Sequence, residues 1–482
     1  MKQSQENLYL CIMMNPRNFY QKLLEQFPFE TTVKQNELLF KLSNFVLSEN
    51  NDKIFVLKGF AGTGKTSVLS TLINGLYLIK KKYVMLAPTG RAAKVVSNYS
   101  GKPAFTIHKH IYYTKDIARG GFTLKANKHK NTIFVVDEAS MLSDNATEGS
   151  TYGSLLDDLI YFVYSGVNCR LILVGDTAQL PPVNQDKSIA LDENQLSLRY
   201  QLSADSIELD EVMRQAEHSG ILYNATLLRE MVQSSFPDAF SFDIQHYTDI
   251  VRLQDSYDTL DAIHDAYGRD GAEDTMFIVR SNKRANLYNQ HIRQRILDRE
   301  GELNAGDYLM VVKNNYYWLK DKKMFIANGD ILEVMRIYNF MELYGFRFAE
   351  VQARLIDYPD IPPFDTIILL DTLTSESPSL TYEEYQRFYQ QVALDYEEVI
   401  SNRKKQEKIH ENEYFNALQV KFGYAVTCHK SQGGQWKKIF VEQPYLPEGF
   451  QVEDIKWLYT AITRATEKLY LLGFEDRFFL TE

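Results

Sequence analysis

The chain has 482 residues, which is long enough for about two to four domains and excludes a single small module. Hydrophobic residues make up 45% of the chain and charged residues 24%, a balance typical of globular proteins that excludes fibrous and wholly disordered chains. The formal net charge of −10 by itself argues against a nucleic-acid partner, because a protein that binds phosphates needs a surplus of Lys and Arg on some surface.

The start of the chain and its cysteines bear on the cellular compartment. Cys11, Cys169 and Cys428 are odd in number and widely separated, so they predict neither a disulfide framework nor a zinc site. The apolar stretch Leu8 to Met14 is short and is not followed by a small-residue cleavage site. No run approaches the roughly 18 to 20 apolar residues that a membrane span needs. We therefore expect a soluble, cytoplasmic protein without a membrane partner.

In the first part of the chain, short β-branched runs alternate with helical patterns. The runs are Ile54 to Leu57, Tyr83 to Leu86, Thr132 to Val136 and Arg170 to Val174. Each run is followed by a polar or glycine-containing turn, as expected for a buried strand. Alternation of strand and helix is typical of a parallel sheet, so the sequence predicts an α/β fold.

A phosphate-binding loop follows the first of these strands. Residues 59–66 read G-F-A-G-T-G-K-T and are followed by a helical pattern, which is the P-loop motif in its expected strand and helix context. The glycines let backbone amides close around a β-phosphate, and the helix N-terminus adds positive potential. Lys65 is expected to reach the β- and γ-phosphates, and the Thr66 hydroxyl to bind Mg²⁺. The nucleotide contacts predicted in this loop are Gly59, Gly62, Thr63, Gly64, Lys65 and Thr66.

The next part of the chain, residues 80–130, is strongly basic. It contains ten Lys and two Arg against one acidic residue, Asp116, so its formal charge is +11 and the rest of the chain carries −21. This distribution reverses the first inference from net charge, because one surface can still bind phosphates. Two β-prone arms surround Gly120-Gly121 and predict a hairpin within the basic segment.

Two carboxylates and one amide follow the next strands. Asp137 is expected to hold Mg²⁺ through water, and Glu138 to polarise the attacking water, which are the roles that phosphoryl hydrolysis requires beyond the phosphate loop. A carboxylate pair after a strand can also be a simple helix cap, but its position after a P-loop favours the catalytic interpretation. Gln179 follows the strand at 170–174, where its amide could sense a γ-phosphate.

The segment 301–418 is predicted to be an inserted domain. Its first part is turn-rich and β-prone, as in a small antiparallel barrel, and its expected strands are Asp307 to Val312, Asp330 to Tyr338 and Phe346 to Ile356. Further on, Thr381 and Glu384 fit a capping box that opens a charged helical segment. We expect this helix to be solvated and to pack one face on a second α/β domain, and a specific binding role is the alternative.

That second α/β domain is assembled from discontinuous stretches. Its expected strands are Met276 to Val279, Tyr424 to Thr427, Lys438 to Glu442 and Lys468 to Leu472. The resulting limits are an N-terminal extension at 1–30, a first domain at 31–215 with the hairpin at about 100–130, a second domain at 216–300 and 419–482, and the insertion at 301–418.

Several motifs together resemble one family. They are the P-loop, A-P-T-G-R-A-A-K at 87–94, T-I-H-K at 106–109, Q-L-P-P-V at 179–183 and T-C-H-K-S-Q-G at 427–433. The set resembles superfamily 1 helicases of the RecD and Dda branch, which moves 5′ to 3′ on single-stranded DNA. The resemblance extends from Gln35 to Arg464 and implies two RecA-like domains with ATP in the cleft between them. It also implies a β-hairpin pin inserted in the first domain and an SH3-like barrel inserted in the second.

The resemblance implies further nucleotide contacts. Gln35 is expected to read the adenine edge, and the alternative is an ordinary polar residue on an N-terminal helix. Arg214 and Arg464 are expected to neutralise charge at the γ-phosphate, and Gly433 is counted among the nucleotide contacts. An arginine from the second domain reaches the phosphate only when the cleft is closed, so hydrolysis would be coupled to domain motion.

The resemblance also implies DNA contacts on both domains, because hydroxyl and cationic groups at strand ends suit phosphates. The aromatic residues of the hairpin either stack on the terminal base pair or pack the hairpin on its own domain. The predicted DNA contacts are Thr89, Arg91, Thr106, His108, Tyr113, Phe122, Pro182, Val183, Thr427, His429 and Lys430.

The sequence therefore favours an ATP- and Mg²⁺-dependent DNA helicase that moves 5′ to 3′ as a monomer. Its expected partners are single-stranded DNA, junctions of single-stranded and duplex DNA, and accessory proteins of replication or repair. Two alternatives stay open: an RNA helicase with the same motor, and a nucleotide-switched partner subunit that does not unwind.

Overall fold

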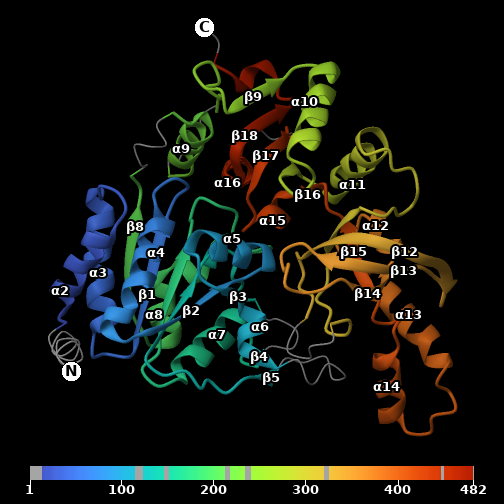
Figure 1. Cartoon of the computed structure of the whole chain (residues 1–482), viewed down its shortest axis with the longest axis horizontal. Coiled ribbons are helices and arrows are strands. Elements are labelled where there is room, and N and C mark those ends of the chain that lie inside the picture. The colour runs from blue at the N-terminus through green and yellow to red at the C-terminus, as the bar shows by residue number, and fades with distance from the viewer. Residues whose placement is uncertain are drawn as a thin grey trace.

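The computed structural model describes residues 14–113, 123–145, 151–211, 218–233, 240–319, 325–446 and 450–480. Figure 1 shows a first α/β domain in blue to green, a second in yellow-green and red, and a barrel with a helical arm in gold to orange. In the described ranges, no helix has the length and apolar character of a membrane span. Cys169 and Cys428 are both buried and free of disulfide bonds.

The first domain is built on a six-stranded sheet in the order β3-β2-β6-β7-β1-β8. Every pair of neighbouring strands in it is parallel. The strands are β1 (Lys53–Gly59), β2 (Lys82–Ala87), β3 (Ala104–Thr106), β6 (Thr132–Val136), β7 (Arg170–Gly175) and β8 (Ser203–Leu209). Strands β6 and β7 are buried along their whole length because helices cover both faces of the sheet. The predicted parallel α/β sheet is thus confirmed.

Alternate side chains of the central strand β1 enter two separate cores. Phe55 and Leu57 pack against α2, α3 and α4, whereas Ile54 and Val56 pack toward α6, α7 and α8. The helices of this domain are α2 (Pro16–Gln26), α3 (Val33–Leu47), α4 (Lys65–Gly75), α5 (Gly90–Ser100), α6 (Ile107–Ile111), α7 (Leu155–Tyr164) and α8 (Glu193–Tyr200). The carboxyl ends of the strands lie at one edge of this sandwich, which is where ligands bind in such folds.

The second domain has a parallel five-stranded sheet in the order β16-β10-β17-β18-β9. Its strands are β9 (Ile250–Leu253), β10 (Thr275–Val279), β16 (Ala425–Thr427), β17 (Trp436–Glu442) and β18 (Ala465–Leu472). Its helices are α9 (Gly220–Gln233), α10 (Ser256–Arg269), α11 (Asn282–His291), α15 (Cys428–Ser431) and α16 (Val452–Ile462). Discontinuous parts of the chain therefore form one sheet, as predicted.

The inserted domain is a closed five-stranded barrel followed by a helical arm. The barrel strands are β11 (Tyr308–Val311), β12 (Ile331–Leu343), β13 (Phe346–Leu355), β14 (Phe364–Leu369) and β15 (Leu418–Phe422). β15 pairs with both β11 and β14, so the barrel continues past residue 418, where we expected the second α/β domain to resume. The small barrel is confirmed, and its SH3-like class stays a prediction.

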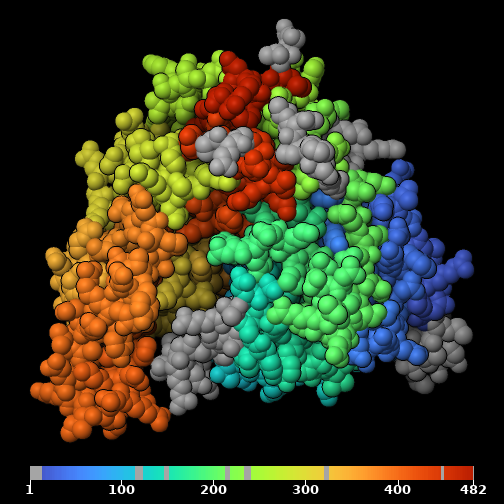
Figure 2. Space-filling view, turned by 180° about the vertical axis from the view of Figure 1, so that it is seen from behind, coloured from blue at the N-terminus to red at the C-terminus, as the bar shows by residue number. Residues whose placement is uncertain are grey.

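The helical arm consists of α13 (Tyr382–Leu394) and α14 (Asn402–Glu411), after the short helix α12 (Asp371–Thr374). The capping box of Thr381 and Glu384 is present. The apolar face of the arm packs on Phe346 and Phe348 of the barrel, so our expectation that it packs on the second α/β domain was wrong. The reason is that β13 offers a matching apolar face of its own. Figure 2 shows the orange arm projecting from one side of the molecule.

A buried ionic cluster joins the second domain to the barrel. Asp307 is fully buried and accepts hydrogen bonds from Arg293 at 2.9 and 3.0 Å, from Arg299 at 3.1 Å and from the Tyr424 hydroxyl at 3.0 Å. Asp307→Ala is expected to lower the free energy of unfolding by about 3–5 kcal/mol, because it leaves a buried guanidinium unpaired. Urea denaturation measures this loss, with the exposed Asp360→Ala as the matched control. A difference below about 1 kcal/mol between the two variants would contradict the prediction.

Candidate nucleotide and nucleic-acid site

The P-loop joins β1 to α4 at the carboxyl edge of the first sheet. Gly62 and Gly64 have φ values of +75° and +79°, a left-handed conformation that only glycine adopts without cost. The Lys65 ammonium donates to the carbonyls of Gly59 and Phe60, the latter at 2.8 Å. The loop therefore surrounds the first turn of α4, where unpaired backbone amides suit an anion.

Gln35 lies directly beside this loop. Its amide nitrogen donates to the Thr63 carbonyl at 3.0 Å, and its amide oxygen accepts from the Thr32 backbone at 3.1 Å as part of a capping box. Thr63 is itself buried, and its hydroxyl donates to the Phe60 carbonyl at 2.8 Å. Thr66 follows Lys65 in the first turn of α4. The structure thus places Gln35 at the nucleotide loop, and its contact with adenine stays a prediction.

Asp137 and Glu138 stand at the carboxyl end of β6. Glu138 has a left-handed φ of +53°, and burial raises the pKa of its carboxyl, an effect that Arg464 opposes. Asp137 accepts hydrogen bonds from the Glu138 backbone at 2.9 Å and from the Tyr99 hydroxyl at 2.5 Å. Tyr99, at the far end of α5, was not predicted as a site residue; its hydroxyl contacts Oδ2 of the carboxylate, whereas the backbone amide contacts Oδ1.

The residues present fit Mg²⁺. No cluster of three or more His, Cys, Asp or Glu side chains capable of binding a metal exists among the described residues. Mg²⁺ needs no such cluster, because it is held by one or two protein oxygens, waters and substrate phosphates. The Asp137 carboxylate and the Thr66 hydroxyl are oxygen donors of that kind.

Tyr99→Phe is expected to raise the Mg²⁺ concentration needed for half-maximal ATP hydrolysis by about tenfold, since a hydrogen bond to a charged group contributes about 1.5–3 kcal/mol. Titration of hydrolysis with Mg²⁺ measures the effect. Binding of a fluorescent ATP analogue in EDTA should be unchanged, because Tyr99 acts through Asp137. Tyr77→Phe, on a side chain that is 68% exposed, is the matched control. An unchanged Mg²⁺ requirement would refute this role for Tyr99.

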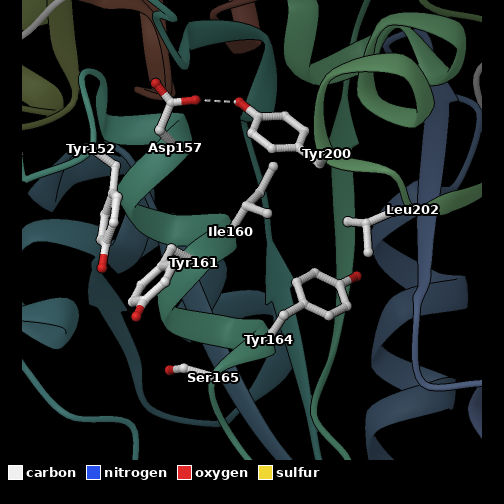
Figure 3. A pocket seen from close by; sticks show the side chains of 8 residues that line it. All are labelled: Tyr152, Asp157, Ile160, Tyr161, Tyr164, Ser165, Tyr200 and Leu202. Carbon is white, nitrogen blue, oxygen red and sulfur yellow. Dashed lines mark hydrogen bonds between the residues drawn. The ribbon is translucent and has the colours of Figure 1, made fainter.

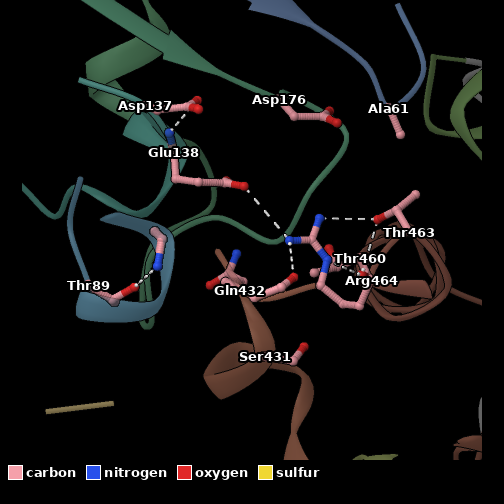
Figure 4. A network of polar contacts seen from close by, with 12 residues as sticks. Ala61, Thr89, Asp137, Glu138, Asp176, Ser431, Gln432, Thr460, Thr463 and Arg464 are labelled. Carbon is pink, nitrogen blue, oxygen red and sulfur yellow. Dashed lines mark hydrogen bonds and ion pairs between the residues drawn. The ribbon is translucent and has the colours of Figure 1, made fainter. Parts of the chain in front are cut away.

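An arginine of the second domain reaches the carboxylate of the first. Arg464, two residues after α16, is only 4% exposed, and its guanidinium lies 3.7 Å from the Glu138 carboxylate. It also donates to the carbonyls of Thr460 at 3.1 Å and Gly434 at 3.3 Å, which fix its direction (Figure 4). Arg464 thus lies beside the predicted catalytic carboxylate Glu138, and its predicted role at a γ-phosphate stays a prediction. Arg214 lies outside the described residues.

Two residues of helix α16 make three further contacts across the cleft. The Tyr459 hydroxyl accepts from the Ala61 amide at 3.0 Å and donates to the Asp176 carboxylate at 2.7 Å. The Thr460 hydroxyl accepts from the Leu180 amide at 2.9 Å. Burial raises the pKa of Tyr459 well above its ordinary value, so it is a neutral hydroxyl here. One helix of the second domain thus contacts the P-loop and the segment after β7 together, and sequence motifs alone did not identify Tyr459.

Gln179 lines a cavity of about 350 Å³ beside this interface. Its amide oxygen is buried and makes no hydrogen bond within the described part of the chain, and the same holds for the hydroxyl of Ser140. Lys456 of α16 also lines the cavity, and burial together with the nearby Lys187 lowers its pKa. The amide is therefore available to a ligand, and its role as a γ-phosphate sensor stays a prediction.

Three predicted DNA contacts share one structural position. Thr89, Thr106 and Thr427 follow or end β2, β3 and β16, and each is the N-cap residue of a helix. Their hydroxyls therefore lie at the carboxyl edges of the two sheets, as expected for contacts to a phosphate backbone. Gly433, with φ of +71°, packs against Thr89 and Ala92 of α5, where an added Cβ would lie 2.7 Å from the Ala92 Cβ. Its predicted nucleotide contact stays a prediction.

The N-terminal half of α5 contacts the second domain and the barrel. Arg91 lies 3.5 Å from the Asp357 carboxylate and 4.8 Å from the centre of the Trp436 ring. Lys94 lies 3.1 Å from the same carboxylate, whose side chain is fully buried. Arg91 thus has a protein partner at the surface where we predicted a DNA phosphate. Asp330, which directly precedes β12, also packs against this helix at Gly90.

The charge state of the other predicted contacts follows from burial. Burial lowers the pKa of His108 to about 4 and lowers the pKa of His429, so both imidazoles are neutral at pH 7. In the second domain, Thr427 and Lys430 line a small cavity with Lys421 of β15. Burial and the Lys430 charge lower the pKa of Lys421 to about 8. Two adjacent lysines favour an anion there, and Lys421 was not among the predicted residues.

The remaining predicted contacts lie beside β7 and in the hairpin. Pro182 is buried and Val183 is 61% exposed. The hairpin arms β4 (Tyr112–Tyr113) and β5 (Thr123–Leu124) pair antiparallel, and the intervening tip with Phe122 lies outside the described residues. Tyr112 is buried and donates to Asp158 at 2.6 Å, so it packs the hairpin on its domain. Tyr113 is 43% exposed and can stack on a base, whereas the pin itself stays a prediction.

Comparison with known proteins identifies both α/β domains. Residues 45–240 match the model of an AAA domain, and residues 422–472 match that of a UvrD-like helicase C-terminal domain. An uncharacterised protein of Acanthamoeba polyphaga mimivirus is 24% identical over 90% of this chain and 98% of its own length.

Two named helicases are also related. The ATP-dependent DNA helicase Pif1 of Campylobacter jejuni is 23% identical over 86% of this chain and 87% of its own length. The ATP-dependent RecD2 DNA helicase of Deinococcus radiodurans is 31% identical over 36% of this chain and 21% of its own length. The two domain models occur in this order on one chain, and the residues of their motifs meet across one cleft. The chain therefore belongs to the superfamily 1 helicases of the RecD- and Pif1-like branch.

Proposed function

We propose that this protein is an ATP-dependent DNA helicase and translocase that moves 5′ to 3′ on single-stranded DNA. The observation that carries the proposal is the approach of Arg464 to Glu138 within 3.7 Å across the cleft. A catalytic site that is completed by residues from both domains forms only when the cleft is closed. Hydrolysis is then coupled to domain motion, which is the requirement for a motor.

The nucleotide would be ATP with Mg²⁺. The phosphates would be held by the P-loop amides and Lys65, and the metal by Thr66 and Asp137; when bound, it supplies charge neutralisation at the phosphates. Glu138 orients the attacking water and accepts its proton. Arg464 neutralises the negative charge that develops on the transferred phosphoryl group.

Single-stranded DNA would cross the carboxyl edges of both sheets. Thr89 and Thr106 supply hydroxyls on the first domain, and Thr427, Lys430 and Lys421 supply a hydroxyl and two cations on the second. None of these groups reads base identity, so binding is independent of sequence. When the cleft closes and opens, the two binding sites approach and separate, and alternation of the tighter site moves the protein along one strand.

Polarity and substrate are tested by unwinding of duplexes that carry either a 5′ or a 3′ single-stranded tail, each in DNA and RNA. Efficient ATP-driven unwinding is expected only for the 5′-tailed DNA. Lys65→Ala should abolish it, because the phosphate contact is lost. Preference for a 3′ tail would contradict the direction of movement. Activity on RNA tails alone would favour the RNA helicase, and ATP hydrolysis without any unwinding would favour the non-unwinding partner.

A further inference from the structure

The first domain has a cationic pocket outside the sheet edges that face the cleft. It has a volume of about 450 Å³, and its lining residues come from the edge strand β3, α6, the hairpin arm β4, the segment 125–129 and α7. Its lining contains three lysines, two histidines and three aromatic residues, and no acidic residue. This lining includes Phe105, His110, Tyr113, Lys125, Lys128 and His129. In a chain with a net charge of −10, such a lining favours an anionic ligand.

The rim of the pocket presents aromatic faces and positive charge together. Phe105 is 39% exposed and Tyr113 is 43% exposed, although large apolar rings are ordinarily buried. Lys128 is exposed and has no ion-pair partner in the ranges that the structure describes. Lys125 donates to the carbonyls of Lys109 and His110 at 2.7 and 3.1 Å, and these hydrogen bonds hold its ammonium group at the wall of the pocket. Stacking faces beside cations are the combination that binds single-stranded nucleic acid without reading its sequence.

The floor of the pocket is uncharged. The rings of His110 and His129 stack with centres 5.2 Å apart, and their Nε2 atoms are 3.2 Å apart. Burial and the neighbouring His129 lower the pKa of His110 to about 4, so the pair carries no charge at pH 7. Phe162 meets His110 edge to face at 5.9 Å. A flat, uncharged floor under a cationic rim suits a base below and phosphates above.

The position of the pocket identifies which strand it would take. Phe105 immediately precedes Thr106, a contact proposed for the translocated strand, and Tyr113 ends the arm β4 of the hairpin. When a duplex is separated at the hairpin, one strand enters the cleft between the domains. The second strand carries the same density of phosphates and has to leave on the other side of the hairpin base. We propose that this pocket binds the displaced strand next to the junction.

Another large cavity of the same domain is lined by aromatic residues but lacks the cations that would bind a phosphate. It has a volume of about 490 Å³ and is lined by four tyrosines and Asp157, without any lysine (Figure 3). Asp157 accepts a hydrogen bond from Tyr200 at 2.7 Å and pairs with Arg199 at 3.0 Å, and the lining of this cavity includes no cation that could bind a phosphate. Tyr161 of this cavity is 51% exposed and supplies a matched control substitution.

The inference rests on the proposed function, and the experiment separates the two. Binding is measured for a 5′-tailed duplex and for a fork that has both tails, with 2-aminopurine in the 3′ tail close to the junction. Wild-type protein should bind the fork more tightly than the 5′-tailed duplex, and stacking should quench the 2-aminopurine. Phe105→Ala and Lys128→Glu should each lower fork affinity about tenfold and restore the fluorescence. Their affinity for the 5′-tailed duplex and their DNA-stimulated ATP hydrolysis should stay within twofold of wild type, as should every property of Tyr161→Ala.

Equal affinity of wild-type protein for both substrates would overturn the inference while leaving the helicase intact. An equal loss of fork and 5′-tail binding in the variants would overturn it as well, since the pocket would then belong to the loading strand. Unchanged fork binding in the variants, together with loss of polyglutamate peptide binding, would assign the pocket to an acidic protein instead. Failure of the wild-type protein to bind the 5′-tailed duplex at all would overturn the proposed function itself.

Discussion

Arg464→Ala is expected to lower the turnover number for DNA-stimulated ATP hydrolysis by about 10³–10⁵-fold, with ATP binding within a few-fold of wild type. The guanidinium lies 3.7 Å from Glu138 and is held by carbonyls of its own domain, so it is directed at the reacting groups rather than at the base or ribose. Steady-state hydrolysis and binding of a fluorescent ATP analogue measure the two quantities separately.

Two controls make this result specific. Arg403→Ala removes an arginine whose side chain is 77% exposed and should leave turnover unchanged. Arg464→Lys keeps the charge but loses the planar fork, so it should recover only a small part of the rate. Because Arg464 is buried, the melting temperature of each variant is compared with wild type. Unchanged turnover in a stable Arg464→Ala protein would refute its catalytic role.

Site residues that occupy short motifs could be predicted from the sequence, whereas residues that act across the fold could not. Lys65 and the carboxylates of 137–138 are recognisable because the chemistry fixes their spacing from a strand end. Tyr99 is 38 positions from Asp137, and Tyr459 is 283 positions from Asp176, so no local pattern marks either contact. Lys421 was missed for a different reason: it is close to Lys430 in the sequence and lines the same cavity, but no motif includes it.

For the fold, too, local sequence patterns predicted some elements and missed those that depend on contacts with distant residues. The central strands β6 and β7 were predicted because they are buried on both faces and therefore continuously apolar. The edge strand β8, with the sequence S-A-D-S-I-E-L, is largely polar and was not predicted. The helical arm at 382–411 was predicted from its capping box, but its docking partner depends on the outer face of β13, which the arm's own sequence does not specify.

Whether this protein can bind phosphates depends on where its charged residues lie rather than on its net charge. The protein has a net charge of −10, yet Lys109, Lys125 and Lys128 of the basic segment line one pocket without an acidic neighbour in its lining. Other cations of that segment, Arg91 and Lys94, are paired with the buried Asp357. The basic segment therefore divides into cations that pair with a buried carboxylate and cations that line a pocket without one, a distinction that only the structure makes.

Glu138→Gln is expected to slow ATP hydrolysis by about 10²–10⁴-fold, because the amide cannot accept a proton from the attacking water. Nucleotide binding should persist, since the P-loop and Asp137 are unchanged, so the variant should accumulate the ATP-bound state. Single-turnover hydrolysis and ATP-analogue binding measure the effect, with Glu467→Gln at an exposed position as the matched control.

The pH dependence of turnover gives an independent check of the same residue. Burial raises the pKa of Glu138 above the ordinary glutamate value of 4.5. A general base is active only when deprotonated, so wild-type turnover should fall on acidification at a pH above 4.5, and the fall should begin closer to neutrality than for an exposed carboxylate. In Glu138→Gln this limb should be absent from the residual rate. A residual rate with the same acid limb as wild type would show that another group, and not Glu138, is the base.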